Sequence, residues 1–162
     1  MARHEYRVTP AGFRPAGRQL PPGCRVRVAD GQDRLELASL MIDAYTDTID
    51  YEGETLEQAV EEVDGYLAGE AVLDLSRVAT LGGEIQSAVL VSRIAGVYLV
   101  GYVMTRAAVK GEGLASALMD TVANAVWASG AEEMRAFITE GNLPSERIFL
   151  RVGYEVVASY GE

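Results

Sequence analysis

The chain has 162 residues with 14 basic and 24 acidic side chains, a formal net charge of −10, and a globular balance of 49% hydrophobic and 23% charged residues, which fits one domain. Its only cysteine, Cys24, excludes a disulfide framework or cysteine-rich zinc site, and its only histidine, His4, argues against Ser-His-Asp catalysis and histidine-rich metal sites. No apolar run reaches the roughly 18–20 residues of a membrane span and no signal peptide is visible, so we expect a soluble cytoplasmic protein without a metal.

The first 27 residues differ from the rest of the chain in charge. They hold six arginines and one acid, a charge of +5, whereas the remainder holds eight bases and 23 acids, a charge of −15. Such an acidic body repels phosphate backbones, which argues against nucleic acid as a partner. The basic stretch is also rich in proline and glycine, so we predict an extended arm or irregular hairpin over residues 1–23 and a single domain over residues 24–162. The arm is expected to be solvated, or to contact an acidic partner or its own acidic body.

Apolar spacing predicts the secondary structure of the domain. Alternating polar and apolar residues predict strands, and apolar residues at helical spacing predict helices. The predicted elements are a strand at 25–28, helices at 35–45 and 55–68, a meander of strands at 71–81, 85–95 and 97–105, a helix at 113–129, a strand at 134–139, a helix at 145–152 and a strand at 154–160. This order is that of an α+β or mixed α/β sheet covered by helices.

A turn with two glycines leads from the meander into the next helix. It runs Val109-Lys110-Gly111-Glu112-Gly113-Leu114-Ala115-Ser116 and contains the only lysine of the chain. Free N–H groups and the helix dipole attract an anion to a helix N-terminus, and glycines let a phosphate approach the main chain. The spacing is neither that of a Walker A loop nor that of the GxGxxG motif. By itself the turn is either an anion site or a structural turn.

Two correctly spaced segments resemble the motifs of one superfamily. The run from Lys110 to Ala115 resembles the [Q/R]-x-x-G-x-[G/A] signature of the GCN5-related N-acetyltransferases (GNATs), with lysine in the first position. The run from Asn142 to Tyr154 resembles their N-x-x-[A/S]-x-x-[L/I]-Y-x-x-x-G-F segment and follows after one helix and one strand, as the superfamily requires. The resemblance covers roughly residues 25–160.

The resemblance implies the GNAT fold, which is a mixed, mostly antiparallel sheet of six or seven strands with about four helices. Its two central strands, here 97–105 and 134–139, splay into a V that binds acetyl-CoA as co-substrate. Backbone amides of the glycine-rich turn would hold the pyrophosphate, and a strand amide would polarise the thioester carbonyl. The residues expected to bind the cofactor are Val103, Met104, Thr105, Lys110, Gly111, Glu112, Gly113, Leu114, Ala115, Ser116, Asn142, Ser145 and Phe149.

The implied reaction is direct attack of a small amine on the thioester within a ternary complex, after the ammonium form has lost a proton. The sequence departs from the superfamily at the residues that move protons: Phe149 replaces the usual tyrosine, and Phe137 stands where some members carry a glutamate. As substitutes we predict Tyr98 and Tyr102, which share one face of a strand by the two-residue period, and Glu140. The alternative is that the tyrosines are packing residues and the glutamate a solvated loop acid.

The connection between the first two predicted helices forms one wall of the acceptor site in GNATs. Residues 43–64 hold nine acids and no base, which favours a cationic amine, although such acids also suit an ordinary surface. We expect Tyr45, Asp47 and Asp50 to contact the acceptor.

Two other functions stay open at this point. One is a CoA-binding sensor or regulatory protein with little or no transferase activity, because the usual proton donor is absent and a fold does not guarantee a reaction. The other keeps the enzyme but changes the acceptor to a hydroxyl group or the donor to another acyl-CoA. Either a monomer or a homodimer is compatible with the sequence.

Overall fold

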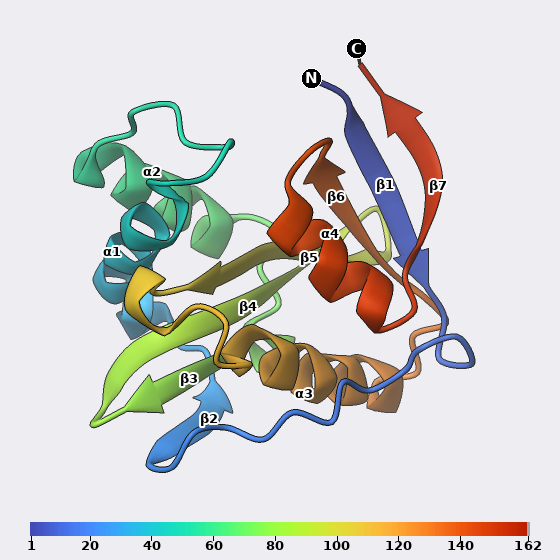
Figure 1. The fold of residues 1–162 in the computed structure, drawn as a ribbon, viewed down its shortest axis with the longest axis horizontal. Coiled ribbons are helices and arrows are strands. Elements are labelled where there is room, and N and C mark those ends of the chain that lie inside the picture. Colours follow the sequence, from blue (N-terminus) through green and yellow to red (C-terminus); the bar gives the residue numbers. More distant parts are fainter. Residues whose placement is uncertain (162) are drawn as a thin grey trace.

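A seven-stranded sheet runs through residues 1–161, the part of the chain that the computed structural model describes (Figure 1). Its order is β2-β3-β4-β5-β6-β1-β7, and all neighbours are antiparallel except β5 and β6, which are parallel. The strands are β1 (Arg3–Val8), β2 (Cys24–Val28), β3 (Arg77–Leu81), β4 (Glu84–Ile94), β5 (Val97–Thr105), β6 (Met134–Thr139) and β7 (Glu155–Tyr160). The mixed, mostly antiparallel sheet that the sequence predicted is confirmed.

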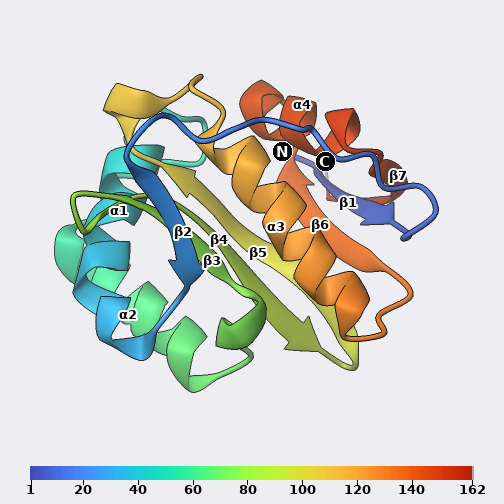
Figure 2. The ribbon, with the colours of Figure 1, turned by 90° about the horizontal axis from the view of Figure 1, so that it is seen from below.

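Within residues 1–161, four α-helices lie on the two faces of this sheet (Figure 2). They are α1 (Arg34–Tyr45), α2 (Leu56–Ala68), α3 (Leu114–Ala128) and α4 (Leu143–Arg151). Local sequence sets their starts: α2 begins with a capping box in which the Thr55 hydroxyl accepts the Gln58 N–H at 3.2 Å and the Gln58 side chain accepts the Thr55 N–H at 2.8 Å. None of these helices is both long and apolar enough to cross a membrane.

Strand β4 separates two apolar cores. Its alternating side chains point to opposite faces, so Ala88 and Leu90 pack with α1 and α2, while Val89 and Val91 pack with α3. These four side chains are at most 1% exposed. A strand buried on both faces explains why this part of the sequence is almost continuously apolar.

The sheet opens between its two parallel strands. β5 and β6 are paired only at Leu99 and Arg135 within the described residues, and past that pair the strands diverge. This divergence is the V-shaped opening that the resemblance implied. The edge of β5 that faces away from β4 therefore has no strand partner beyond Leu99, so its backbone groups face the opening.

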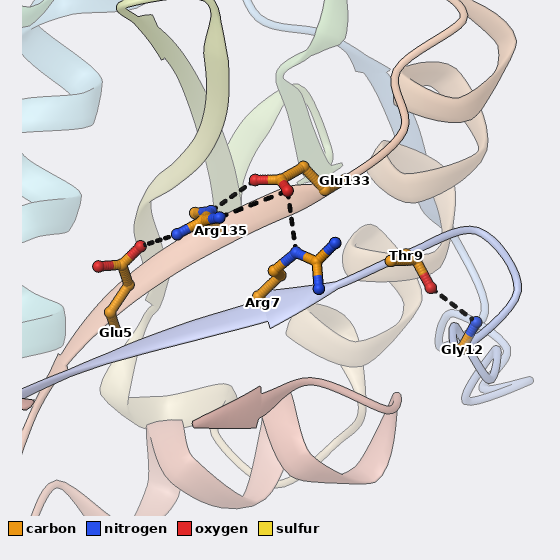
Figure 3. A network of polar contacts seen from close by, with 6 residues as sticks. All are labelled: Glu5, Arg7, Thr9, Gly12, Glu133 and Arg135. Carbon is orange, nitrogen blue, oxygen red and sulfur yellow. Dashed lines mark hydrogen bonds and ion pairs between the residues drawn. The ribbon is translucent and has the colours of Figure 1, made fainter. Parts of the chain in front are cut away.

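A charged network joins β1 to β6 at the closed end of the V (Figure 3). Arg135 contacts both Glu5 and Glu133, and Arg7 donates to Glu133 at 2.9 Å. The Tyr160 hydroxyl donates to the second Glu5 oxygen at 2.8 Å. The side chain of Glu5 is almost completely buried, so its charge depends on these donors, which tie β6, β1 and β7 together.

A β-bulge in β5 changes the direction of its side chains. Tyr102 is paired with Leu90 and Val100 with Val91, so Gly101 is an extra residue on this strand. As a result Tyr102 packs with the α1–α2 core, whereas Tyr98 packs with the α3 core. The expectation that the two tyrosines share one face is wrong, because the two-residue period is interrupted between them.

The N-terminus differs from the sequence-based expectation of an arm over residues 1–23. Arg3–Val8 is an interior strand of the sheet, with Tyr6 and Val8 buried, so the N-terminal residues are part of the same domain. Residues 9–23 have no helix or strand but pass along α3, where Asp120 accepts the N–H groups of Ala16 at 2.8 Å and Gly17 at 2.9 Å (Figure 2). Proline and glycine keep this segment irregular, and although most of its residues are exposed, it is hydrogen-bonded to α3.

Candidate functional site

Two cavities meet at the open edge of β5. The larger cavity, of about 480 Å³, lies between the diverging strands and the α1–α2 segment. The smaller cavity, of about 230 Å³, lies between β5 and the N-terminal ends of α3 and α4. The residues that line both cavities are Tyr45, Val103, Asn142 and Ser145. A molecule in one cavity can thus touch a molecule in the other at this junction.

The glycine-rich turn forms one end of the smaller cavity. Gly111 and Gly113 both have left-handed backbones, with φ of +85° and +87°, a conformation that favours glycine. Gly113 is the N-cap of α3, and no side chain within residues 1–161 caps this helix. The first N–H groups of α3, from Leu114 to Ser116, therefore have no intrahelical acceptor and lie where these residues line the cavity. This end of the cavity suits an anion.

Lys110 lies beside this turn on the wall shared with α1. Its ammonium group donates to the carbonyl oxygen of Ala44 at 2.6 Å, near the C-terminal end of α1. The helix dipole favours a cation there. The only lysine of the chain consequently ties the glycine-rich turn to α1 and brings one positive charge to the smaller cavity.

Arg18 approaches the same turn from the N-terminal segment. A Cβ atom placed on Gly113 would lie 2.8 Å from the Arg18 Nε atom, so the guanidinium group lies directly against this glycine. The Asp120 bonds to Ala16 and Gly17 hold the chain just before it. Sequence patterns do not indicate this contact, because it joins residues nearly a hundred positions apart.

Most of the residues predicted to bind the cofactor line the smaller cavity. They are Val103, Thr105, Lys110, Gly111, Gly113, Leu114, Ala115, Ser116, Asn142 and Ser145. Met104, Glu112 and Phe149 do not line it. Met104 points into the α1–α2 core and its carbonyl accepts from Ser87 at 2.8 Å, Glu112 is exposed on the outside of the turn, and Phe149 lines the larger cavity instead.

Acidic side chains dominate the charge of the larger cavity. Asp50, Glu54 and Glu62 line it, and Arg3 is the basic residue among its lining residues. The Arg3 guanidinium lies over the Phe137 ring, 5.4 Å from its centre. The cavity therefore has a net negative wall on the side of α1 and α2, which favours a positively charged occupant.

Two tyrosines lie among these acids. The Tyr102 hydroxyl donates to a Glu62 oxygen at 2.5 Å, and burial together with this carboxylate raises the pKa of Tyr102. The Tyr45 hydroxyl donates to the Val103 carbonyl at 3.5 Å, and burial, reinforced by Asp50 and Glu62, raises the pKa of Tyr45. Both hydroxyls therefore stay protonated and act as donors at neutral pH.

Asn142 links the two cavities through its side chain. Its amide nitrogen donates to Asp50 at 2.9 Å, and its oxygen accepts the Ser145 N–H at 3.4 Å at the start of α4. The amide therefore fixes the acidic loop against the N-terminus of α4. An Asn at the start of the second superfamily motif has a structural reason here, independent of any ligand.

The predicted acceptor and catalytic residues divide into two groups. Tyr45, Asp50 and Tyr102 line the larger cavity, whereas Asp47, Tyr98 and Glu140 line neither cavity. Asp47 is exposed on its loop. Tyr98 points to the other face because of the bulge, and Arg93 lies over its ring at 5.0 Å.

Glu140 is turned away from the cavities by the pairing of its own backbone. Its N–H donates to the Ala2 carbonyl at 2.8 Å, next to β1, and its carboxylate lies 3.9 Å from the His4 ring. This position is exposed on the β1 side of β6. The structure therefore gives no support to Glu140 as a proton acceptor. That role was predicted from the position of Glu140 just after β6, without knowledge that β1 pairs with β6.

Sequence reasoning missed the contribution of α2 to the larger cavity. Glu54, Gln58 and Glu62 all line it and are spaced four residues apart, which places them on one side of the helix and its first turn. The nine acids between residues 43 and 64 indicated this region of the chain. The four-residue spacing could have shown which of these acids lie on the side of α2 that faces the cavity.

Comparisons with known proteins found a matching family model and solved structures of the same fold. A family model described as FR47-like protein matches residues 84–160. A GCN5-related N-acetyltransferase from Sphaerobacter thermophilus superposes with a TM-score of 0.75 and 21% identity, over 98% of this chain and 49% of that one. This chain thus spans about half the length of the Sphaerobacter protein. No curated protein matches the chain.

Two of the similar structures contain coenzyme A or acetyl-CoA. The PaiA N-acetyltransferase from Thermoplasma acidophilum, in complex with coenzyme A, has a TM-score of 0.71 and 12% identity over 85% of this chain and 93% of its own. A GNAT family acetyltransferase from Brucella melitensis, in complex with acetyl-CoA, has a TM-score of 0.56 and 24% identity over 67% of this chain and 71% of its own. These neighbours share the fold of this chain, which is the GNAT fold.

Proposed function

We propose that the protein is an acyl-CoA-dependent N-acyltransferase that transfers acetyl from acetyl-CoA to a small cationic amine. The observation that carries the proposal is the meeting of an anion-suited cavity and an acidic cavity at the unpaired edge of β5. A thioester at this junction has the cofactor on one side and the acceptor on the other. Direct attack in a ternary complex then requires no intermediate on the protein.

The smaller cavity supports the cofactor half of this proposal. The N–H groups at the start of α3 are suited to a pyrophosphate, and Lys110 and Arg18 bring two positive charges to the same turn. The free edge of β5 from Val100 to Thr105 is suited to a pantetheine arm, which pairs with backbone groups as an added strand does. A β5 amide would polarise the carbonyl of the thioester.

The larger cavity supports the acceptor half. Its acids attract an alkylammonium, and Glu62 supplies a carboxylate that accepts the proton this group must lose before it can attack. The bond of Glu62 with Tyr102 holds the carboxylate on the cavity wall. In this proposal Tyr102 positions the Glu62 carboxylate, and Glu62 accepts the proton that the sequence analysis expected Glu140 to accept.

Release of free CoA thiol with a panel of amines and carboxylic acids tests the proposal. We expect turnover with cationic amines only. Glu62→Gln should lower kcat/KM for the best amine by about 10²-fold, since general base catalysis contributes roughly this much. Glu61→Gln is the matched control, because Glu61 is the neighbouring exposed glutamate of α2 and does not line the cavity. Acetylation of anionic acceptors alone would contradict the proposal.

The second candidate is a CoA-binding sensor with little or no transferase activity. The observation in its favour is Phe149, which is 3% exposed and places no hydroxyl group where the resemblance expects a tyrosine. Calorimetry separates the two functions. Tight acetyl-CoA binding without thiol release across broad amine and alcohol panels would establish the sensor, and turnover would exclude it.

A further inference from the structure

The phenylalanine at position 149 leaves open what protonates the departing CoA thiolate. Its ring packs against Tyr154, with ring centres 4.8 Å apart, and against Tyr6 at 6.4 Å. The Tyr154 hydroxyl is buried and has no partner among the described residues, but it does not line either cavity. A donor must therefore come from another element.

Tyr45 occupies the place where such a donor is needed. It is the last residue of α1 and reaches over β5, where its hydroxyl contacts the Val103 carbonyl at 3.5 Å. Among the tyrosines of residues 1–161, it alone lines both cavities. A carbon–sulfur bond that spans the junction would lie beside this hydroxyl.

The other junction residues are poorer donors. Val103 has no polar side chain, and the Asn142 amide is already bound to Asp50 at 2.9 Å. The alcohol of Ser145 is a far weaker acid than a phenol. Tyr102 and Tyr51 line only the larger cavity, and the Tyr102 hydroxyl faces Glu62.

We propose that Tyr45 is the proton donor to the sulfur of departing CoA, in the place of the tyrosine that position 149 lacks; the inference rests on the proposed transferase function. The nitrogen–carbon bond forms first, and the carbon–sulfur bond then breaks with its electron pair going to sulfur. Tyr45 gives its hydroxyl proton to that sulfur and takes a proton from the positively charged nitrogen. The remaining ammonium proton has already passed to Glu62 and on to solvent, so the products are amide, free thiol and one proton.

The surroundings of Tyr45 keep it ready for this step. Burial and the nearby carboxylates of Asp50 and Glu62 disfavour the phenolate, so the hydroxyl remains protonated before attack. Lys110 is the cation on the same wall, and it is bound to the Ala44 carbonyl. Because the phenolate is disfavoured, Tyr45 must receive the proton from nitrogen at the same time as it gives its own proton to sulfur. Tyr45 therefore relays a proton and does not become a phenolate between the two transfers.

Tyr45→Phe tests this assignment with a loss of one oxygen atom. We expect kcat to fall by about 10²-fold, the usual contribution of a general acid, with the Kd of acetyl-CoA and the thermal midpoint within experimental error of the wild type. Tyr98→Phe is the matched control, because Tyr98 lines neither cavity and should retain wild-type kcat. A Tyr45→Phe enzyme with kcat within twofold of wild type would overturn the proposal.

A second variant distinguishes proton transfer from packing. Replacement of Tyr45 by 3,5-difluorotyrosine keeps the hydroxyl but makes it more acidic. We expect this enzyme to regain activity near neutral pH and to lose kcat at alkaline pH, at a lower pH than the wild type does. Unchanged pH profiles with full activity in both Tyr45 variants would show a purely structural residue. Absence of thiol release in the wild type despite acetyl-CoA binding would instead refute the proposed function itself.

Discussion

Single residues at the glycine-rich turn decide whether its backbone can face a ligand. Gly111 and Gly113 have nearly the same left-handed φ, so an alanine at either position pays a similar conformational cost of roughly 1–3 kcal/mol. Their surroundings differ, however. A Cβ on Gly111 meets open space, whereas one on Gly113 meets the Arg18 guanidinium.

This pair gives a residue-scale prediction for cofactor binding. Gly113→Ala should raise the Kd of acetyl-CoA at least tenfold, because it displaces Arg18 and crowds the N–H groups of α3. Gly111→Ala is the control for backbone strain and should weaken binding less, although both variants lose similar stability. Calorimetric titration with acetyl-CoA, alongside thermal unfolding, measures the two effects. Equal Kd values of acetyl-CoA for the two variants would show that binding does not depend on the absence of a side chain at Gly113.

At the scale of elements, the N-terminal segment of residues 9–23 is held against α3 by the carboxylate of Asp120 and by an aromatic contact. Both carboxylate oxygens of Asp120 accept backbone N–H groups of the segment, and Phe13 packs edge-on against Trp127 of α3 at 6.2 Å. The segment also reaches α4, where Arg14 donates its N–H to the Val152 carbonyl at 2.8 Å. These contacts explain how a stretch rich in proline and glycine stays in place.

Asp120→Ala should release this segment. We expect the free energy of unfolding to fall by roughly 1–3 kcal/mol, since two backbone donors lose a charged acceptor. Asp120→Asn keeps one acceptor oxygen and should lose less. Urea denaturation measures both variants, and proteolysis within residues 9–23 should accelerate only for the variants that lose stability. An Asp120→Ala protein as stable as the wild type would show that apolar packing alone holds the segment.

For the whole molecule, the ion-pair network at the closed end of the V links stability to pH. Hydrogen bonds from Arg135 and then from Tyr160 lower the pKa of Glu5, and a hydrogen bond from Arg135 lowers the pKa of Glu133. A carboxylate with a lowered pKa in the folded state stabilises the fold above its unfolded pKa, near 4.5. This stabilisation is lost as the pH falls below that value toward the folded pKa.

Glu5→Gln checks this dependence directly. We expect the variant to have a lower thermal midpoint than the wild type at pH 7, with the difference shrinking as the pH falls below about 4.5, where protonation removes the same charge from the wild type. Glu155→Gln, at an exposed position on β7, is the control and should follow the wild type at every pH. A difference in thermal midpoint that stays constant down to pH 3 would show that the loss of stability does not come from the charge of Glu5.

The sequence by itself determined most of the elements, the mixed sheet and the glycine-rich turn at the start of α3. Periodicity and turn residues are local, so helices and strands from Cys24 to Tyr160 could be predicted with shifts of a few residues, such as the start of β3 at Arg77 instead of residue 71. The residues of the turn that line the smaller cavity could also be predicted, because they are contiguous in the chain. The strand β1 was missed because Arg3–Val8 was grouped with the adjacent segment rich in proline and glycine, although Tyr6 and Val8 alternate with charged residues as in a strand.

Only the tertiary structure decided which side chains share the site. The bulge at Gly101 separates Tyr98 from Tyr102, and the pairing of β1 beside β6 directs Glu140 outward. Packing of α1 and α2 against β5 brings Tyr45 to the cavity junction and Glu62 to the acidic wall. Sequence spacing describes neighbours along one element, whereas a site is built from elements that meet only when two apolar cores close on the two faces of the sheet.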